Sequence, residues 1–171
     1  MVNIQRLRHR PISEIRKVLN CESTIDLAKV AQMLNVSIVP YCFTQPSNDS
    51  EKILCFFVTN ENGKACIFYD VELVDNKKRE LLRLALTQTF VRYILTGKEK
   101  FRITRSTKFS DRENNLVDEL LMPAEKVKEV INKLLFPTPY SLAVIFGVST
   151  EFVKRRLDKM NIRTFMVGYN F

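Results

Sequence analysis

The chain is poor in the residues that mark several classes of protein. Its 171 residues include only four glycines, six prolines and one histidine. So little glycine and proline excludes a collagen-like repeat and low-complexity disorder. Hydrophobic residues make up 46% of the chain, which suffices for the packed core of one globular domain.

Histidine and cysteine form no metal-binding or redox motif. His9 lies between two arginines, where we expect a solvated side chain. Cys21, Cys42, Cys55 and Cys66 are widely spaced and include no CxxC pair. We therefore expect four reduced thiols in the core or on the surface.

Long apolar runs are also missing. No run approaches the roughly 20 residues of a membrane-spanning helix, and the N-terminal segment contains no apolar signal-peptide core. We therefore expect a cytoplasmic protein that makes no membrane contact. Lysine and arginine number 27 against 19 acidic residues, a formal charge of +8, which favours an acidic partner such as nucleic acid.

Apolar periodicity and turn residues predict an α+β fold. A first helix is expected to end near residue 20, and Thr24 is expected to cap the next one. Residues 75–96 contain no glycine or proline and are apolar around much of their circumference, so we expect a buried helix. Residues 98–113 are expected to form a polar connector. The other predicted strands are residues 36–43, 52–60 and 64–70, the last two forming a hairpin, and the other predicted helices are residues 25–35, 114–122 and 124–135.

Two segments carry a resemblance to a known family. Residues 83–96, RLALTQTFVRYILT, resemble the active-site helix of the ImmA/IrrE family of zinc metallopeptidases, with Leu86, Tyr93 and Leu95 at equivalent places. Residues 112–123, RENNLVDELLMP, are similar to a family segment that also ends in ELLMP. The resemblance covers most of residues 25–160. It implies a metallopeptidase-like (zincin-like) domain in which a small β-sheet packs on helices.

The residues that would bind zinc in this family are replaced. In an HExxH motif, two histidines one helical turn apart share the metal and the adjacent glutamate activates its water. Gln88, Thr89 and Arg92 stand at the places of the first histidine, the glutamate and the second histidine, and Arg112 stands where a metal-binding glutamate is expected. None of these side chains supplies that chemistry. The resemblance therefore implies a pseudoenzyme without catalytic residues, bound metal or cofactor.

The two arginines allow two interpretations. Arg92 and Arg112 could bind an anion where the metal belonged. Alternatively, both pair with neighbouring carboxylates such as Asp111 or Glu113 and fill a vestigial cavity.

The C-terminal segment has a helix-turn-helix pattern. Residues 140–146 and 150–160 are predicted helices around the turn Gly147-Val148-Ser149. The segment LAVIFGVSTEFVKRRL resembles the DNA-reading unit of many regulators, but a similar helix pair also completes the peptidase domain of the family. The tail, residues 162–171, is expected to add a strand or to cover an exposed edge. In the DNA-reading interpretation, the nucleic-acid contacts are Thr150, Lys154, Arg155, Arg156 and Lys159.

These observations predict three segments and one regulatory function. The segments are a basic N-terminal helix (1–22), a degenerate metallopeptidase-like domain (23–136) and a helix-turn-helix-like segment packed on the same domain (137–171). The resemblance implies an association with helix-turn-helix repressors of mobile elements and stress responses. We therefore expect a non-catalytic regulator, encoded by a phage or mobile element, that binds a protein partner such as a helix-turn-helix repressor through the old substrate cleft or its rim. The alternative is a DNA-binding regulator that uses the C-terminal helix pair.

Overall fold

Helices and one four-stranded sheet make up the protein, which confirms the predicted α+β class. The computed structural model describes residues 4–21, 24–61, 64–75 and 78–164. In these ranges, no helix has both the length and the hydropathy needed to cross a membrane. Most of the C-terminal tail lies outside the described residues, so its expected strand or covering role stays a prediction.

The sheet is mixed, with the strand order β1-β3-β2-β4. Strand β1 (Val36–Tyr41) runs parallel to β3 (Ala65–Asp70). Strand β2 (Ile53–Thr59) runs antiparallel to β3 and also to β4 (Lys100–Thr104). The predicted hairpin of β2 and β3 is thus confirmed.

Strand β4 corrects the prediction of a connector over residues 98–113. It forms an edge of the sheet, with Phe101 and Ile103 turned to the core and Lys100 and Arg102 turned away from it. Only two apolar residues alternate with these bases, which is too short a pattern to distinguish from a polar loop. Pairing with β2, rather than local propensity, makes this segment a strand.

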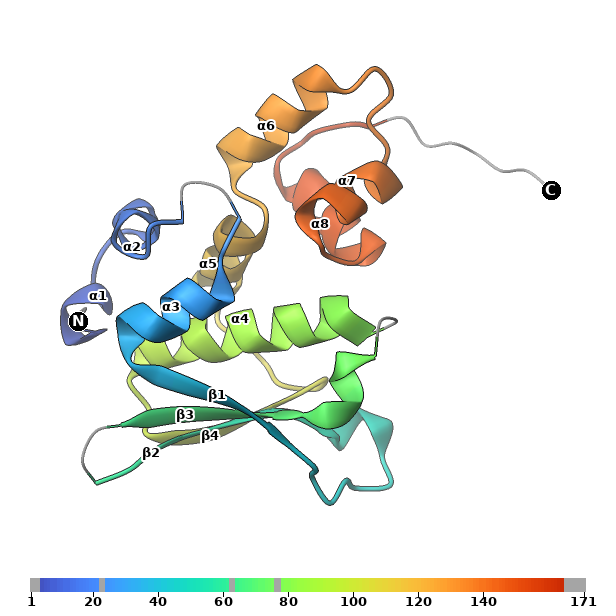
Figure 1. Cartoon of the computed structure of the whole chain (residues 1–171). Coiled ribbons are helices and arrows are strands. Elements are labelled where there is room, and N and C mark those ends of the chain that lie inside the picture. The colour runs from blue at the N-terminus through green and yellow to red at the C-terminus, as the bar shows by residue number, and fades with distance from the viewer. Residues whose placement is uncertain (1–3, 22–23, 62–63, 76–77, 165–171) are drawn as a thin grey trace.

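Helix α4 (Arg79–Thr96) lies along one face of the sheet, its inner face (Figure 1). The Phe57 ring of β2 packs against Tyr93 of α4, with 4.3 Å between ring centroids, and against Phe101 at 4.9 Å. Gly97 ends the helix with φ of 61°, a conformation that favours glycine. The predicted buried helix is confirmed.

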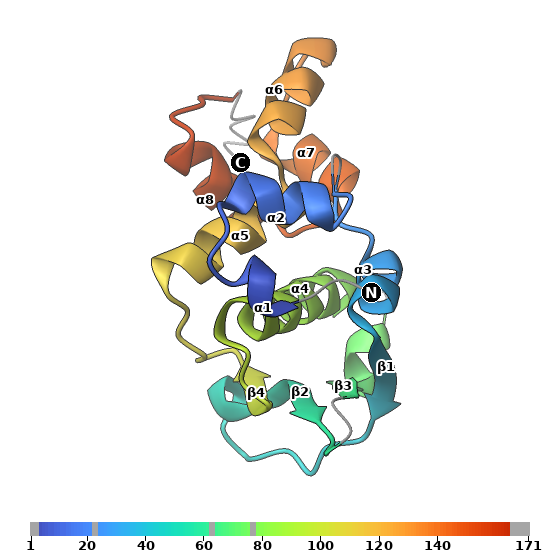
Figure 2. The ribbon, with the colours of Figure 1, turned by 90° about the vertical axis from the view of Figure 1, so that its left-hand side faces the viewer.

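The remaining helices lie on α4 and beyond it. Strands, then α4, then α5 to α8 follow one another from bottom to top in Figure 1, and the view turned by 90° keeps this order (Figure 2). One hydrophobic core joins these layers. These helices are α1 (Ile4–Leu7), α2 (Ile12–Val18), α3 (Leu27–Leu34), α5 (Asp111–Leu121), α6 (Ala124–Lys133), α7 (Pro139–Phe146) and α8 (Thr150–Lys159), and the short 3-10 turns are Asp49–Glu51 and Val71–Val74.

One detail of the N-terminal prediction is confirmed and another is wrong. Helix α2 ends close to the predicted end near residue 20 and starts directly after Pro11, because proline lacks the amide that a helix interior needs, and the short helix α1 precedes it. Asp26 rather than Thr24 caps α3, since its carboxylate accepts hydrogen bonds from the amides of Ala28 and Lys29, each 3.1 Å long. The division into segments at residues 22 and 136 stays a prediction.

Candidate functional site

The α4 residues Gln88, Thr89 and Arg92, which the resemblance places at a vestigial metal site, lie in different surroundings. Thr89 is fully buried, and its hydroxyl donates to the carbonyl of Ala85 at 2.7 Å. It also faces Cys55 of β2, and burial raises the pKa of that thiol to about 12. Gln88 is partly exposed and forms no hydrogen bond with any described residue. Thr89 is therefore part of the contact between α4 and the sheet.

Arg92 joins α4 to the start of α5. Its Nε donates to Oε1 of Glu113 at 2.8 Å and its Nη2 donates to the Lys108 carbonyl at 2.6 Å. The guanidinium carbon lies 4.3 Å from the centroid of the Phe109 ring, a cation–π contact. Both members of the Arg92–Glu113 pair are largely buried, so the guanidinium is committed to three protein partners.

Glu113 also completes a capping box at the start of α5. Its Oε2 accepts from the amide and the hydroxyl of Ser110, at 2.7 and 3.0 Å, while the Ser110 hydroxyl accepts from the Glu113 amide. Burial raises the pKa of the Glu113 carboxyl, but the hydrogen bonds from Arg92 and Ser110 outweigh it and hold the pKa below its ordinary value of 4.5. The carboxylate form is thus the one this site stabilises.

Arg112 does not join Arg92. It is exposed, and its Nη2 donates to the backbone carbonyl of Arg10 at 2.8 Å, between α1 and α2. Adjacent residues of a helix differ by about 100° in direction, which separates Arg112 from the Glu113 side chain. Of the two interpretations, carboxylate pairing holds for Arg92, whereas Arg112 binds a carbonyl instead.

The residues that ligate metals in other proteins are dispersed in this structure. Within residues 4–21, 24–61, 64–75 and 78–164, no three histidine, cysteine, aspartate or glutamate side chains are grouped to hold a metal ion. His9 is exposed in the turn after α1. The prediction of four free thiols is confirmed: Cys21 and Cys55 are buried, Cys66 is partly buried and Cys42 is exposed.

The basic residues of α8 are bound to the other end of α5. Arg155 Nη2 and Lys159 Nζ donate to the two carboxylate oxygens of Asp118, at 2.9 and 2.6 Å. The Asp118 side chain has no exposed surface, so these two cations compensate a fully buried charge. Arg155 and Lys159 lie one helical turn apart, the spacing at which both can meet one acid.

Glu119 forms a second link at the same end of α5. It accepts from Arg156 of α8 on one oxygen and from Arg16 of α2 on the other, the latter at 3.1 Å. Arg156 Nε also donates to the carbonyl of Met122 at 3.1 Å. Asp118 and Glu119 therefore hold α2, α5 and α8 together.

This arrangement bears on the predicted nucleic-acid contacts. Arg155, Arg156 and Lys159 are engaged with α5, although Arg155 and Lys159 keep part of their surface exposed. Lys154 is exposed, and Thr150 is partly exposed at the start of α8. Binding of nucleic acid through this helix stays a prediction. Among the described lysine and arginine residues of the helix, Lys154 is the one that forms no ion pair.

Sequence reasoning missed a large apolar surface beside these helices. Five large side chains of α7 and of the segment before it are between 48% and 87% exposed. The opposite side of α7 is buried, as the predicted packing positions Leu142 and Ala143 require. We call the exposed set the α7 surface: Leu135, Phe136, Tyr140, Val144 and Ile145. The sequence feature that could have indicated this surface is that α7 carries apolar residues on opposite faces.

Comparison with known proteins adds no relative. No family model, curated protein or solved structure matches this chain.

Proposed function

We propose that the protein is a non-catalytic pseudo-peptidase that acts as a regulatory binding protein on a partner protein, of which a helix-turn-helix repressor is the type that the ImmA/IrrE resemblance implies. The arrangement of α4 on the inner face of the sheet and of the ELLMP segment in the neighbouring α5 supports a metallopeptidase-like fold. Gln88, Thr89 and Arg92 supply no metal ligand set, and Arg92 is held by Glu113.

The observation that carries the proposal is the α7 surface. Monomeric proteins seldom expose several large apolar side chains next to one another, and such patches mark sites of protein association. Tyr140 and Val144 are four residues apart and so share one face of α7, and Leu135 and Phe136 precede the same helix. The partner is therefore expected to bind here rather than in the space between α4 and α5, which Arg92 and Phe109 occupy.

The border of the α7 surface indicates the chemistry of the partner. A groove beside Pro139 at the start of α7 is lined by two exposed bases and one exposed acid together with apolar side chains: Lys154, Arg163, Asp158, Leu157 and Ile162. A partner that presents apolar side chains bordered by carboxylates complements this surface.

The test is co-expression of the full chain with the product of the adjacent gene. We expect the two proteins to co-elute in size-exclusion chromatography. Val144→Asp places a charge on the α7 surface and should weaken the complex at least tenfold, because hot-spot truncations cost about 2 kcal/mol or more. Val74→Asp is the matched control, since Val74 is similarly exposed on a different part of the protein.

Three results would overturn the proposal. The first is that no complex forms. The second is that the Val144→Asp and Val74→Asp variants bind the partner equally well. The third is that the purified chain hydrolyses the partner.

A further inference from the structure

The outer face of the sheet, opposite α4, carries an ordered set of side chains. The described helices lie on the other side of the strands (Figures 1 and 2). The strand registers place Val39, Phe68, Phe56 and Arg102 in one row across all four strands. The neighbouring row consists of Ser37, Cys66, Val58 and Lys100.

The centre of this face is aromatic. Phe56 and Phe68 are directly opposite on β2 and β3, and both are partly exposed. Tyr41, which is half exposed, meets the Phe68 ring edge-on at 5.7 Å between centroids. The Lys100 ammonium lies 5.8 Å from the centroid of the Phe56 ring. The rings therefore lie side by side with a cation above one of them.

The β4 edge of this face is basic. Residues 98–108, KEKFRITRSTK, contain five bases and one acid. Arg105 pairs with Asp49, whereas Lys100 and Arg102 form no ion pair with any described residue. Two unpaired cations thus follow one another along the outer side of β4.

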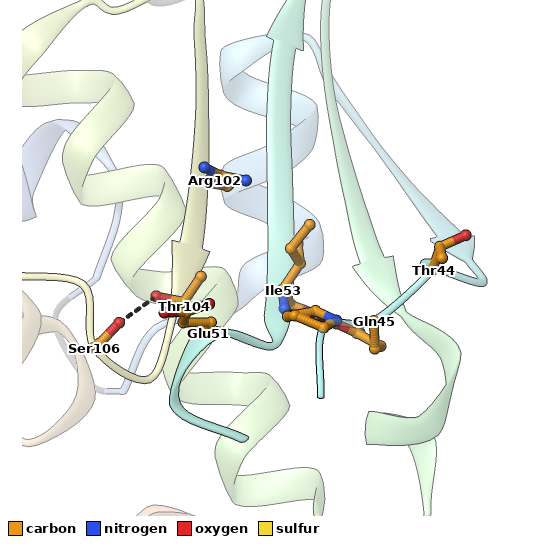
Figure 3. A pocket seen from close by; sticks show the side chains of 8 residues that line it. Thr44, Gln45, Glu51, Ile53, Arg102, Thr104 and Ser106 are labelled. Carbon is orange, nitrogen blue, oxygen red and sulfur yellow. Dashed lines mark hydrogen bonds between the residues drawn. The ribbon is translucent and has the colours of Figure 1, made fainter. Parts of the chain in front are cut away.

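A pocket of about 600 Å³ adjoins Arg102, and its lining mixes apolar groups with Glu51 and several hydroxyl and amide side chains. Figure 3 shows Arg102 and Thr104 on β4, Ser106 just after it, and Gln45 on the loop that crosses the end of the sheet. The Gln45 amide donates to the Ile53 carbonyl at 3.0 Å and to Asp70 at 2.8 Å, which fixes this loop. The pocket therefore offers hydroxyl groups next to the basic edge.

We propose that this face binds single-stranded RNA, with bases stacked on Phe56 and Phe68 and phosphates at Lys100 and Arg102. Sheets with aromatic residues on their central strands bind two or three unpaired bases in this way, and basic groups alongside follow the backbone. A duplex keeps its bases stacked on one another and cannot use the rings. The hydroxyls of Thr104 and Ser106 are suited to the ribose 2′-hydroxyl, which distinguishes RNA from DNA.

The chemistry of this site differs from that of the α7 surface. Stacking of a base on an aromatic ring contributes to affinity whatever the base is, so the loss of one ring is measurable. The inference does not depend on the proposed function, because it uses none of the residues of α7.

The experiment is fluorescence anisotropy of a labelled twelve-nucleotide uridine oligomer with the full chain at 50 mM salt. We expect binding that weakens as salt rises, since phosphate contacts release counterions. Phe68→Leu keeps the apolar bulk but removes the ring and should weaken binding about fivefold or more. Arg102→Glu should weaken binding further and reduce the slope of log affinity against log salt by about one.

Matched controls are Arg6→Glu and Lys17→Glu, charge reversals at exposed bases of α1 and α2 away from the sheet. They should leave RNA affinity unchanged. The inference is overturned by no binding at 50 mM salt, by equal or tighter binding of the matching duplex or of single-stranded DNA, or by equal losses in the controls. A dimer in size-exclusion chromatography that Phe68→Leu dissociates would also overturn it, because a second copy would then cover the face.

Discussion

Buried carboxylates at the two ends of α5 are compensated by basic side chains in different ways. At its start, one buried carboxylate, Glu113, serves both the capping box and one arginine of α4. Near its end, Asp118 is fully buried and is compensated by Arg155 and Lys159 of α8. The first link is reinforced by backbone groups, whereas the second depends on side-chain charges alone. We therefore expect the second to be the more sensitive to substitution.

This comparison also separates structural from functional cations. The sequence offers Arg92 as an anion-binding residue and Arg156 as a nucleic-acid contact, yet both are nearly buried and hold helices together. Arg102 and Lys154 are exposed and form no ion pair with the described residues. An exposed lysine or arginine without an ion pair in the fold is therefore the better candidate for contact with a partner.

The largest effect is expected from Asp118→Ala. It leaves Arg155 and Lys159 without their shared carboxylate, and breaking a buried ion pair costs about 3–5 kcal/mol of unfolding free energy. Urea denaturation followed by circular dichroism measures this. Asp158→Ala, an exposed change on α8, is the control and should shift the midpoint very little. Equal effects of the two variants would mean that α8 is not held by Asp118.

An intermediate effect is expected from Glu113→Gln at neutral pH, about 1–3 kcal/mol, because Arg92 loses its charged acceptor. The effect should depend on pH. Since the folded pKa of Glu113 lies below 4.5, its carboxylate contributes stability above that pH and loses it as the pH falls through the folded pKa. The difference between wild type and variant should therefore vanish in acid.

Glu129→Gln is the control for this pH dependence. Hydrogen bonds from Lys126 and Lys133 lower the pKa of Glu129 to about 2, but the group is exposed and its ion pairs are screened by water and salt. We expect an unchanged unfolding midpoint at pH 7. A Glu113→Gln difference that persists at pH 2 would contradict the assignment of the effect to the carboxylate.

The smallest effect is expected from Arg112→Ala. Its bond to the Arg10 carbonyl is exposed, and substitutions at exposed positions usually change stability by about 0.5 kcal/mol or less. Thermal unfolding should show a midpoint within a few degrees of wild type. Destabilisation as large as that of Glu113→Gln would show that Arg112 and Arg92 act as one unit.

Sequence reasoning was reliable where the pattern is local. The period of apolar residues predicted α4 and the hairpin of β2 and β3. It was unreliable for β4, whose two inward residues form too short an alternation, and for the cap of α3. Both depend on which neighbour supplies the hydrogen bonds, and no local rule contains that information.

The candidate sites follow the same division. That Gln88, Thr89 and Arg92 form no zinc-ligand set is visible in the sequence, as is the excess of basic charge. Sequence could not show that Asp118 would be buried against α8, nor that the apolar residues Tyr140 and Val144 would be left exposed.

Taken by itself, the chain determined its longer helices, the hairpin of β2 and β3 and the chemistry that Gln88, Thr89 and Arg92 cannot perform, because helix and strand periods and side-chain donor atoms are local properties. Only the tertiary structure decided which charges are paired and which apolar faces remain open. Those outcomes depend on residues far apart in the chain meeting across helices and strands, and burial is a property of the assembled fold.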